Sequence, residues 1–395
     1  MTIPNIPKGF KFSSASSGIK KSERKDIGLI FSEVESNIAG LFTTNKVKAA
    51  PVRLALEKII SHRGQAIIAN SGNANACTGG KGMEDAVEMA NLTAEKLGIK
   101  PELVYVASTG VIGEPMHMER LRRGLVEAVS GLGNGCIEDV AMAIMTTDTF
   151  PKIVSREVNI DGGNGVITGI AKGAGMICPD MATMLSFIMT DISISAQAID
   201  LALRESVSKS FNRLTVDGDR STNDTVLLIA NGTLGNNELS IDSKEFASFK
   251  RTLDDITHEL SRLIAKDGEG ATKLIEVVVV GARNEDDAKR AAFAVANSNL
   301  VKTAIYGNDA NWGRIMAAVG YSGADIIDDM VSIFFNDLKV VEKGLTLRKD
   351  KEAAEILKDK EIRITVDLGL GNAETKVLSC DLTEEYIRIN AAYRS

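Results

Sequence analysis

The chain has 395 residues, of which 44% are hydrophobic and 25% are charged, and its formal net charge is −7 at pH 7. These values are typical of a globular protein with a substantial core, in one large or two medium domains. The acidic balance argues against a nucleic-acid partner and gives no support for binding to a membrane. The N-terminal residues lack the apolar stretch of a secretory signal, so a cytoplasmic location is expected.

Cysteine and acidic residues give no sign of a metal site. The four cysteines form no CxxC pair, which predicts neither zinc nor disulfides, and each is interpreted as a buried apolar residue: Cys77, Cys136, Cys178 and Cys380. Asp217 and Asp219 lack a third ligand at suitable spacing and are interpreted as solvated turn carboxylates.

Histidine is scarce, which limits the possible mechanisms. None of the three histidines (His62, His117 and His258) lies in a motif with catalytic character. A Ser-His-Asp or Cys-His mechanism would need one of them beside the nucleophile. A base of another kind is therefore expected.

Helical and strand patterns alternate along the chain. In chain order we expect a helix at 52–60, a strand at 65–69, a helix at 84–97, a strand at 103–107, helices at 118–129 and 137–145, a hairpin at 153–170, a strand at 184–189, helices at 196–211 and 244–266, a strand at 273–280, a helix at 285–297, a strand at 330–335, a helix at 351–357, and strands at 362–366 and 386–389. This alternation favours an α/β fold with mixed sheets and helices on their outer faces.

The helix at 244–266 has the clearest pattern. Its apolar residues recur at spacings of three and four and form one stripe: Phe246, Phe249, Leu253, Ile256, Leu260 and Leu263. Ser243 is expected to cap its start and Gly268 to mark its end.

The segment from Lys172 to Asp191 carries the strongest functional signal. A glycine-rich, proline-containing approach leads to Ala182 and Thr183, and an apolar run begins at Met184. This order places a hydroxyl at the start of a buried strand, although many strands begin with threonine after such a loop. The arrangement suits a threonine that attacks the peptide bond before it and then acts as an N-terminal nucleophile, with its own α-amino group (pKa about 7.7–8.0) as the base.

Polar segments elsewhere accompany this threonine. Residues 106–113 follow a strand and contain Thr109 and Gly110, either as an ordinary turn or as backbone donors for an oxyanion. Residues 146–149, 269–273 and 389–395 are also polar without an evident packing reason. The Asn- and Gly-rich segments 69–79, 215–224 and 307–314 are interpreted mainly as scaffolding turns.

From about residue 10 to the end, these segments together resemble the ornithine acetyltransferase family of arginine biosynthesis. The resemblance implies self-cleavage between Ala182 and Thr183, within the pentapeptide from Met181 to Leu185. It also implies a sandwich of helix, sheet, sheet and helix layers, similar to self-processing aminopeptidases. The fragments would be residues 1–182 and 183–395, sharing one fold and assembled as a heterotetramer of two of each.

Site residues follow from the same resemblance. It assigns the nucleophile to Thr183 and the oxyanion hole to Thr109 and Gly110. It assigns substrate contacts to Thr146, Lys172, Thr183, Glu269, Asn390 and Ser395. Within this set, our hypothesis is that Lys172 and Asn390 bind the substrate α-carboxylate, while Glu269 or the C-terminal carboxylate binds the ornithine side-chain amine.

The implied reaction moves an acetyl group from N-acetylornithine to Thr183 and then to glutamate, without a resident cofactor or metal. Acetyl-CoA as a second donor is left open. Two alternatives remain: a self-processed amidase or aminopeptidase that uses water as acceptor, and an uncut, non-catalytic amino-acid-binding protein.

Overall fold

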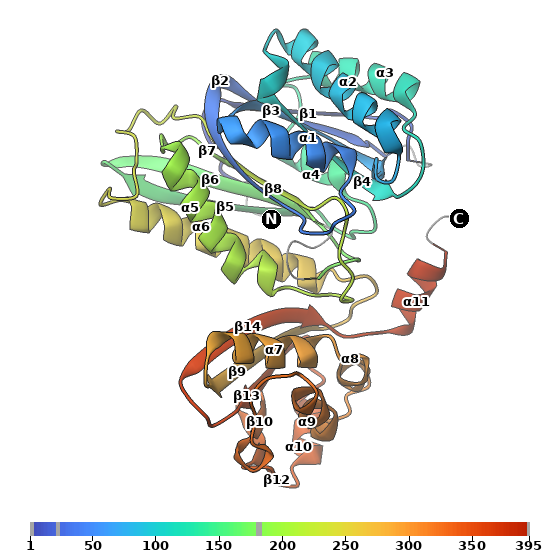
Figure 1. Ribbon diagram of the computed structural model, residues 1–395, viewed down its shortest axis with the longest axis vertical. Coiled ribbons are helices and arrows are strands. Elements are labelled where there is room, and N and C mark those ends of the chain that lie inside the picture. Colours follow the sequence, from blue (N-terminus) through green and yellow to red (C-terminus); the bar gives the residue numbers. More distant parts are fainter. Residues whose placement is uncertain (1–3, 21–23, 179–183, 393–395) are drawn as a thin grey trace. The chain divides into compact units, whose positions relative to one another are not determined.

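The computed structural model describes residues 4–20, 24–178 and 184–392 (Figure 1). The chain forms two compact units. The first comprises Met1–Gly173, Asp180–Asn212 and Arg220–Leu260, and the second comprises Ala174–Pro179, Arg213–Asp219 and Ser261–Ser395. Each unit therefore contains chain from both sides of residue 182.

The first unit is built on eight strands. They are β1 (Phe10–Ala15), β2 (Ile27–Phe42), β3 (Arg63–Asn73), β4 (Val104–Val111), β5 (Lys152–Ile160), β6 (Gly163–Lys172), β7 (Leu185–Thr190) and β8 (Thr225–Ala230). The helices are α1 (Ala50–Lys58), α2 (Gly79–Leu97), α3 (Met118–Ser130), α4 (Ile137–Ile144), α5 (Ala196–Lys209) and α6 (Phe246–Lys266), the last of which ends in the second unit.

The long strand β2 folds this sheet into two facing layers. Hydrogen bonding follows the order β4-β3-β2-β8-β7-β6-β5, with β1 also on β2. Residues 27–31 of β2 pair with β3, whereas residues 37–42 pair with β8, and the register shifts between Phe31 and Ser36. Side chains from both halves, among them Ile67 and Tyr105 from one and Phe187 and Leu227 from the other, form a single buried cluster.

Helices cover the outer faces of both layers. Ile68 and Val106, on the opposite side of β3 and β4 from that cluster, pack with Met89 of α2 and Leu121 of α3. On the other layer, α6 lies directly on β6 at a glycine (Figure 1). The first unit is thus a helix–sheet–sheet–helix sandwich, and the predicted fold class is confirmed.

The second unit is a six-stranded sheet with helices. Its elements are β9 (Leu274–Ala282), α7 (Glu285–Ala296), α8 (Asn299–Tyr306), α9 (Trp312–Gly320), β10 (Ser332–Phe335), β11 (Leu338–Glu342), β12 (Leu345–Thr346), α10 (Asp350–Ile356), β13 (Glu361–Asp367), β14 (Ala373–Cys380) and α11 (Glu384–Ala391). The strand order is β12-β11-β10-β13-β9-β14, with β13 parallel to β9 and the other pairs antiparallel.

Alternation along β9 separates a core face from a charged face. Ile275, Val277 and Val279 belong to one buried cluster with residues of α7, α8, α9 and α10. Glu276, between them, instead binds Arg363 of β13 at 2.7 Å. This period of two is the signature of a half-buried strand.

Most predicted elements are present, but the expected strand at 386–389 is wrong. Those residues belong to α11, because Thr383 caps the helix by accepting a hydrogen bond from Glu385 N and two glutamates occupy the first turn. The predicted cap at Ser243 is also wrong, since α6 begins at Phe246 and Ser243 Oγ accepts from Ser240 N. The sequence did not predict β1, β2, β8, β11, β12, β14, α8 or α9.

Two of the four cysteines differ from their interpretation. Cys178 and Cys380 are buried, as expected, whereas Cys77 and Cys136 are exposed. Cys136 precedes α4, where its Sγ lies 3.4 Å from Asp139 Oδ2, so a polar helix start explains its exposure. In the part of the chain that the structure describes, no helix has the length and apolarity needed to cross a membrane.

Gly169 offers a test of how α6 packs on β6. A Cβ at this position would lie 2.9 Å from Leu260 Cδ1 and 3.1 Å from Ile256 Cγ2. Valine suits a strand, so Gly169→Val should lower the free energy of unfolding by about 1–3 kcal/mol through overpacking alone. Urea denaturation measures this, and an unchanged midpoint would contradict the packing.

The control is Gly80→Ala in α2, where a Cβ meets open space. Its unfolding free energy should stay the same or rise by up to about 1 kcal/mol, because alanine favours a helix more than glycine does.

Candidate functional site

Lys172 brings three of the predicted residues together. It is the last residue of β6, and only 2% of it is exposed. Its Nζ donates to Thr146 Oγ1 at 2.9 Å and to Thr109 Oγ1 at 3.3 Å. Thr109 comes from β4 and Thr146 follows α4, so three separate elements meet at one buried ammonium group.

Asp148 holds this group in place, although the sequence did not single it out. Its Oδ1 accepts from Lys152 Nζ at 2.8 Å and from Gly173 N at 2.6 Å, and its Oδ2 accepts from Thr146 N at 3.0 Å. Burial alone would raise the pKa of Asp148, but the charges of Lys172 and Lys152 and these hydrogen bonds hold that pKa well below its usual range. Asp148 is therefore an anion that fixes the backbone of Thr146 and of Gly173, the residue after Lys172.

The described charged groups of this cluster leave a positive balance. Lys152 and Lys172 against Asp148 give one net positive charge, in a buried place. Lys20 lies close enough to interact electrostatically with Lys172. Burial lowers the pKa of Lys20 to about 8; the charge of Asp26 opposes this lowering, and the charge of Lys172 increases it. Such a cluster suits a substrate carboxylate or a developing oxyanion.

Position 110 requires glycine because the backbones of β3 and β4 approach each other closely there. It pairs with Gly72 across β3 and β4 and has a φ of +132°. A Cβ there would lie 2.3 Å from Gly72 C and 2.6 Å from Asn73 N. Gly110 is therefore part of a strand end and not an isolated turn, and packing alone accounts for the glycine.

A short segment before β8, interpreted from the sequence as scaffolding, bonds both to the residue before Thr109 and to the residue after Thr183. Asn223 Nδ2 donates to Ser108 O at 2.8 Å and to Ala74 O at 2.6 Å, which fixes the residue before Thr109. Asp224 Oδ1 accepts from Met184 N at 3.1 Å, which fixes the residue after Thr183. The strand β7 is further held in register, with Leu185 opposite Lys172 on one side and Thr225 on the other.

Three predicted residues cannot be placed. Ala182 and Thr183, the expected cleavage site, and Ser395 lie outside the described residues.

In the second unit, the structure brings Glu269 and Asn390 together. Asn390 Nδ2 donates to Glu269 Oε2 at 2.7 Å and to Tyr386 O at 3.0 Å. Glu269 is 7% exposed, and its amide donates to Ala174 O at 2.8 Å. A Cβ on Gly175 would overlap the Glu269 carboxyl group, so glycine is needed beside it. The amide nitrogen of Asn390 is thus engaged with a carboxylate of the protein itself.

The interpretation of Asp217 from the sequence is wrong. It is not a solvated turn carboxylate: Oδ2 accepts from Met176 N at 2.6 Å and from the Tyr386 hydroxyl at 3.2 Å, and Oδ1 accepts from Ile177 N at 2.9 Å. Burial raises the pKa of Asp217, against the opposing effect of these amides. It organises the segment that leads toward residue 182 and anchors α11. Among residues 4–20, 24–178 and 184–392, no group of three or more His, Cys, Asp or Glu side chains could hold a metal ion.

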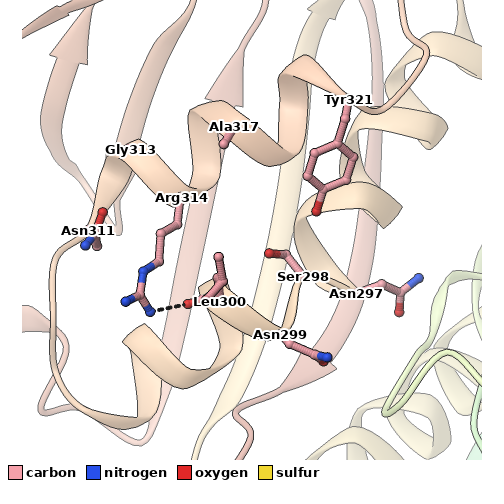
Figure 2. Close-up of a pocket in the computed structure, with 9 residues that line it drawn as sticks. All are labelled: Asn297, Ser298, Asn299, Leu300, Asn311, Gly313, Arg314, Ala317 and Tyr321. Carbon is pink, nitrogen blue, oxygen red and sulfur yellow. Dashed lines mark hydrogen bonds between the residues drawn. The ribbon is translucent and has the colours of Figure 1, made fainter.

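A pocket of 490 Å³ in the second unit contains none of the predicted site residues. It is lined by Asn297, Ser298, Asn299, Leu300, Asn311, Gly313, Arg314, Ala317 and Tyr321. Figure 2 shows Arg314 of α9 reaching the carbonyl oxygen of Leu300 in α8, a hydrogen bond of 2.7 Å. The polar segment 307–314 therefore joins two helices, in agreement with its interpretation as scaffolding.

Comparison with known proteins identifies the family. Residues 11–395 match the model of the ArgJ family. The chain belongs to the ArgJ family.

Close relatives span the whole chain. The arginine biosynthesis bifunctional protein ArgJ of Geobacter sulfurreducens is 52% identical over 390 residues, which cover 98% of this chain and 99% of that protein. The protein of the same name from Caldanaerobacter subterraneus is 51% identical over 395 residues, covering 99% and 98%. A crystal structure of ArgJ from Bacillus halodurans, 43% identical, matches 53% of this chain and 100% of its own with a TM-score of 0.52. The arginine-biosynthesis family recognised from the sequence, and with it the prediction of an enzyme, is confirmed.

The ion cluster around Asp148 gives a stability prediction. Asp148→Asn keeps the shape of the side chain but removes the buried negative charge that pairs with Lys152 and acts on Lys172. We expect the free energy of unfolding to fall by about 3–5 kcal/mol, the usual cost of breaking a buried ion pair. Urea denaturation of the variant and its parent measures the difference.

Asp139→Asn is the matched control, because Asp139 pairs with Lys25 near the surface. It should cost no more than about 1 kcal/mol. An equal loss of unfolding free energy in the two variants would show that the buried ion pair contributes no more to stability than the surface pair.

Proposed function

We propose that this chain is a glutamate N-acetyltransferase that cuts itself between Ala182 and Thr183 and then carries an acetyl group on Thr183. The observation that carries the proposal is Lys172, a buried cation bonded to Thr109 and Thr146 and located at the end of β6, opposite Leu185, the first residue of β7. Membership of the ArgJ family supports the same reaction.

Self-cleavage begins when Thr183 Oγ attacks the carbonyl carbon of Ala182. The carbon–nitrogen bond breaks, the proton lost from Oγ is balanced by one gained at the Thr183 nitrogen, and water then hydrolyses the ester. The products are residues 1–182 and 183–395. They stay together because β7 and β8, from the second fragment, lie between β6 and β2, from the first, in one hydrogen-bonded sheet.

Acetyl transfer then uses the released α-amino group as base. Thr183 Oγ takes the acetyl group of N-acetylornithine, ornithine leaves, and the α-amine of glutamate accepts the acetyl group. Thr109 and Gly110 stabilise the tetrahedral oxyanion at each step. Lys172 binds the substrate α-carboxylate. Glu269, oriented by Asn390, keeps its predicted role as a carboxylate suited to an amine.

The relatives named bifunctional support a second donor. In this part of the proposal, acetyl-CoA also acetylates Thr183, so that the enzyme makes N-acetylglutamate with either donor and needs no resident cofactor. A cytoplasmic location and an assembly of two copies of each fragment complete the proposal.

The cleavage and the acyl-enzyme are tested together. Purified protein should contain fragments of 182 and 213 residues that elute as one species, whereas Thr183→Val should remain a single chain, because valine has the shape of threonine without the nucleophile. Mass spectrometry after brief mixing with N-acetylornithine should find one acetyl group on Thr183.

Two results would contradict this account. One is an uncut wild-type chain, as expected of a binding protein. The other is release of acetate as fast as N-acetylglutamate, as expected of an amidase.

The role of Lys172 is tested with paired acceptors. Loss of a charged hydrogen bond to a carboxylate costs about 1.5–3 kcal/mol, so Lys172→Met should raise the KM for glutamate about 10- to 100-fold. Wild-type enzyme should discriminate against glutamate α-amide, and the variant should lose that discrimination. Retained discrimination would assign the α-carboxylate to another residue.

A further inference from the structure

Asp224 is a buried acid with one unoccupied oxygen. It is 0% exposed and immediately precedes β8. Its Oδ1 accepts from Met184 N at 3.1 Å, while its Oδ2, equally buried, has no hydrogen-bond partner in the described structure. Buried carboxyl oxygens are rarely left unpaired, so this one calls for an explanation.

The backbone around Asp224 is firmly fixed. Its carbonyl oxygen accepts from Thr43 N at 3.1 Å, and Thr225 N donates to Met184 O at 3.1 Å. The hydroxyls of Thr43 and Ser221 lie near enough to this carboxyl group to lower its pKa, but neither makes a hydrogen bond to Oδ2, and Thr43 Oγ1 donates to Ser221 O at 2.8 Å. The unpaired oxygen is thus held rigidly beside the strand that begins just after Thr183.

The expected leaving group is covalently linked to the residue whose amide Asp224 binds. The nitrogen of Thr183 is three bonds from the nitrogen of Met184, to which Asp224 is already bonded. When the bond between Ala182 and Thr183 breaks, this nitrogen must gain a proton. Lys172, the nearby cation, has hydrogen bonds to Thr109 and Thr146.

We propose that Asp224 supplies the proton that the Thr183 nitrogen takes up when the bond to Ala182 breaks. This inference rests on the proposed self-cleavage and names Asp224 as the general acid of that reaction. Asp224 gives its Oδ2 proton to the departing nitrogen, and the proton leaving Thr183 Oγ restores it. No net proton is gained or lost, and the product of this step is the ester.

Burial supports this assignment. It raises the pKa of Asp224 well above the usual value, against the opposing effects of the Met184 amide, the Ser221 and Thr43 hydroxyls and the Lys172 charge. Burial therefore favours the protonated form of Asp224, which is the form that can donate.

Asp224→Asn is the test, because asparagine keeps an acceptor for Met184 N and removes the acidic proton. Cell-free synthesis of the full chain, sampled on denaturing gels, measures the rate of cleavage. General acids contribute factors of about 10²–10⁴, so we expect cleavage at least about 100-fold slower than wild type. Hydroxylamine, which cleaves esters, should not restore the rate, because the ester does not form.

The control is Asp191→Asn at the opposite end of β7. Asp191 is also buried, and its carboxylate accepts from Val166 N at 2.9 Å. This variant should cleave at the wild-type rate. If Asp224→Asn has a lower thermal unfolding midpoint than Asp191→Asn, Asp224→Ser provides a smaller replacement with the same expected loss of cleavage.

The outcomes separate this inference from the proposed function. Wild-type cleavage with equally fast cleavage in a folded Asp224 variant overturns the role of Asp224 alone. Restoration by hydroxylamine also overturns it, because the defect would then lie in ester hydrolysis. A wild-type chain that is never cut overturns the proposed function itself.

Discussion

The negative charge of Asp148 is the constraint on which the first-unit site depends. Two lysines are buried beside it, and burying their charges without a counter-charge would cost several kcal/mol. The same carboxylate accepts hydrogen bonds from the backbone of Thr146 and Gly173. One charge therefore sets the position of Thr146 and of the chain that leaves β6 after Lys172.

A second constraint is the register of β7 between β6 and β8. Leu185 lies opposite Lys172 and Thr225, and the segment before β8 bonds to both Met184 and Ser108. The residue that precedes β7 and the strand that carries Thr109 are thus held by adjacent residues, Asp224 and Asn223. Cleavage at residue 182 would leave this arrangement in place, because its hydrogen bonds cross between fragments within one sheet.

Sequence reasoning predicted what local patterns and motifs encode. The apolar stripe of α6 determines a helix, and the family motifs indicated Thr109, Thr146 and Lys172, which the structure brings together. Asp148 and Asp224 were missed, and Asp217 was misinterpreted as a solvated carboxylate, because the proximity of their partners depends on tertiary folding. The tail around Tyr386 was misassigned because its alternating apolar residues also fit a helix, and the cap at Thr383 decides between the two.

The proposed mechanism uses no histidine. Two carboxyl groups, those of Asp148 and Asp224, lie in opposite environments and can take the roles that a histidine would otherwise fill. Asp148 is surrounded by lysines and amides, which hold its pKa below the usual range, whereas Asp224 has one amide and an unpaired oxygen, and burial raises its pKa. Groups of the same type whose pKa values are driven apart can divide the roles of fixed anion and proton donor. In the proposed mechanism, a threonine that provides its own amine needs no imidazole, because Lys172 at the end of β6 supplies a cation and Asp224, just before β8, supplies the acid.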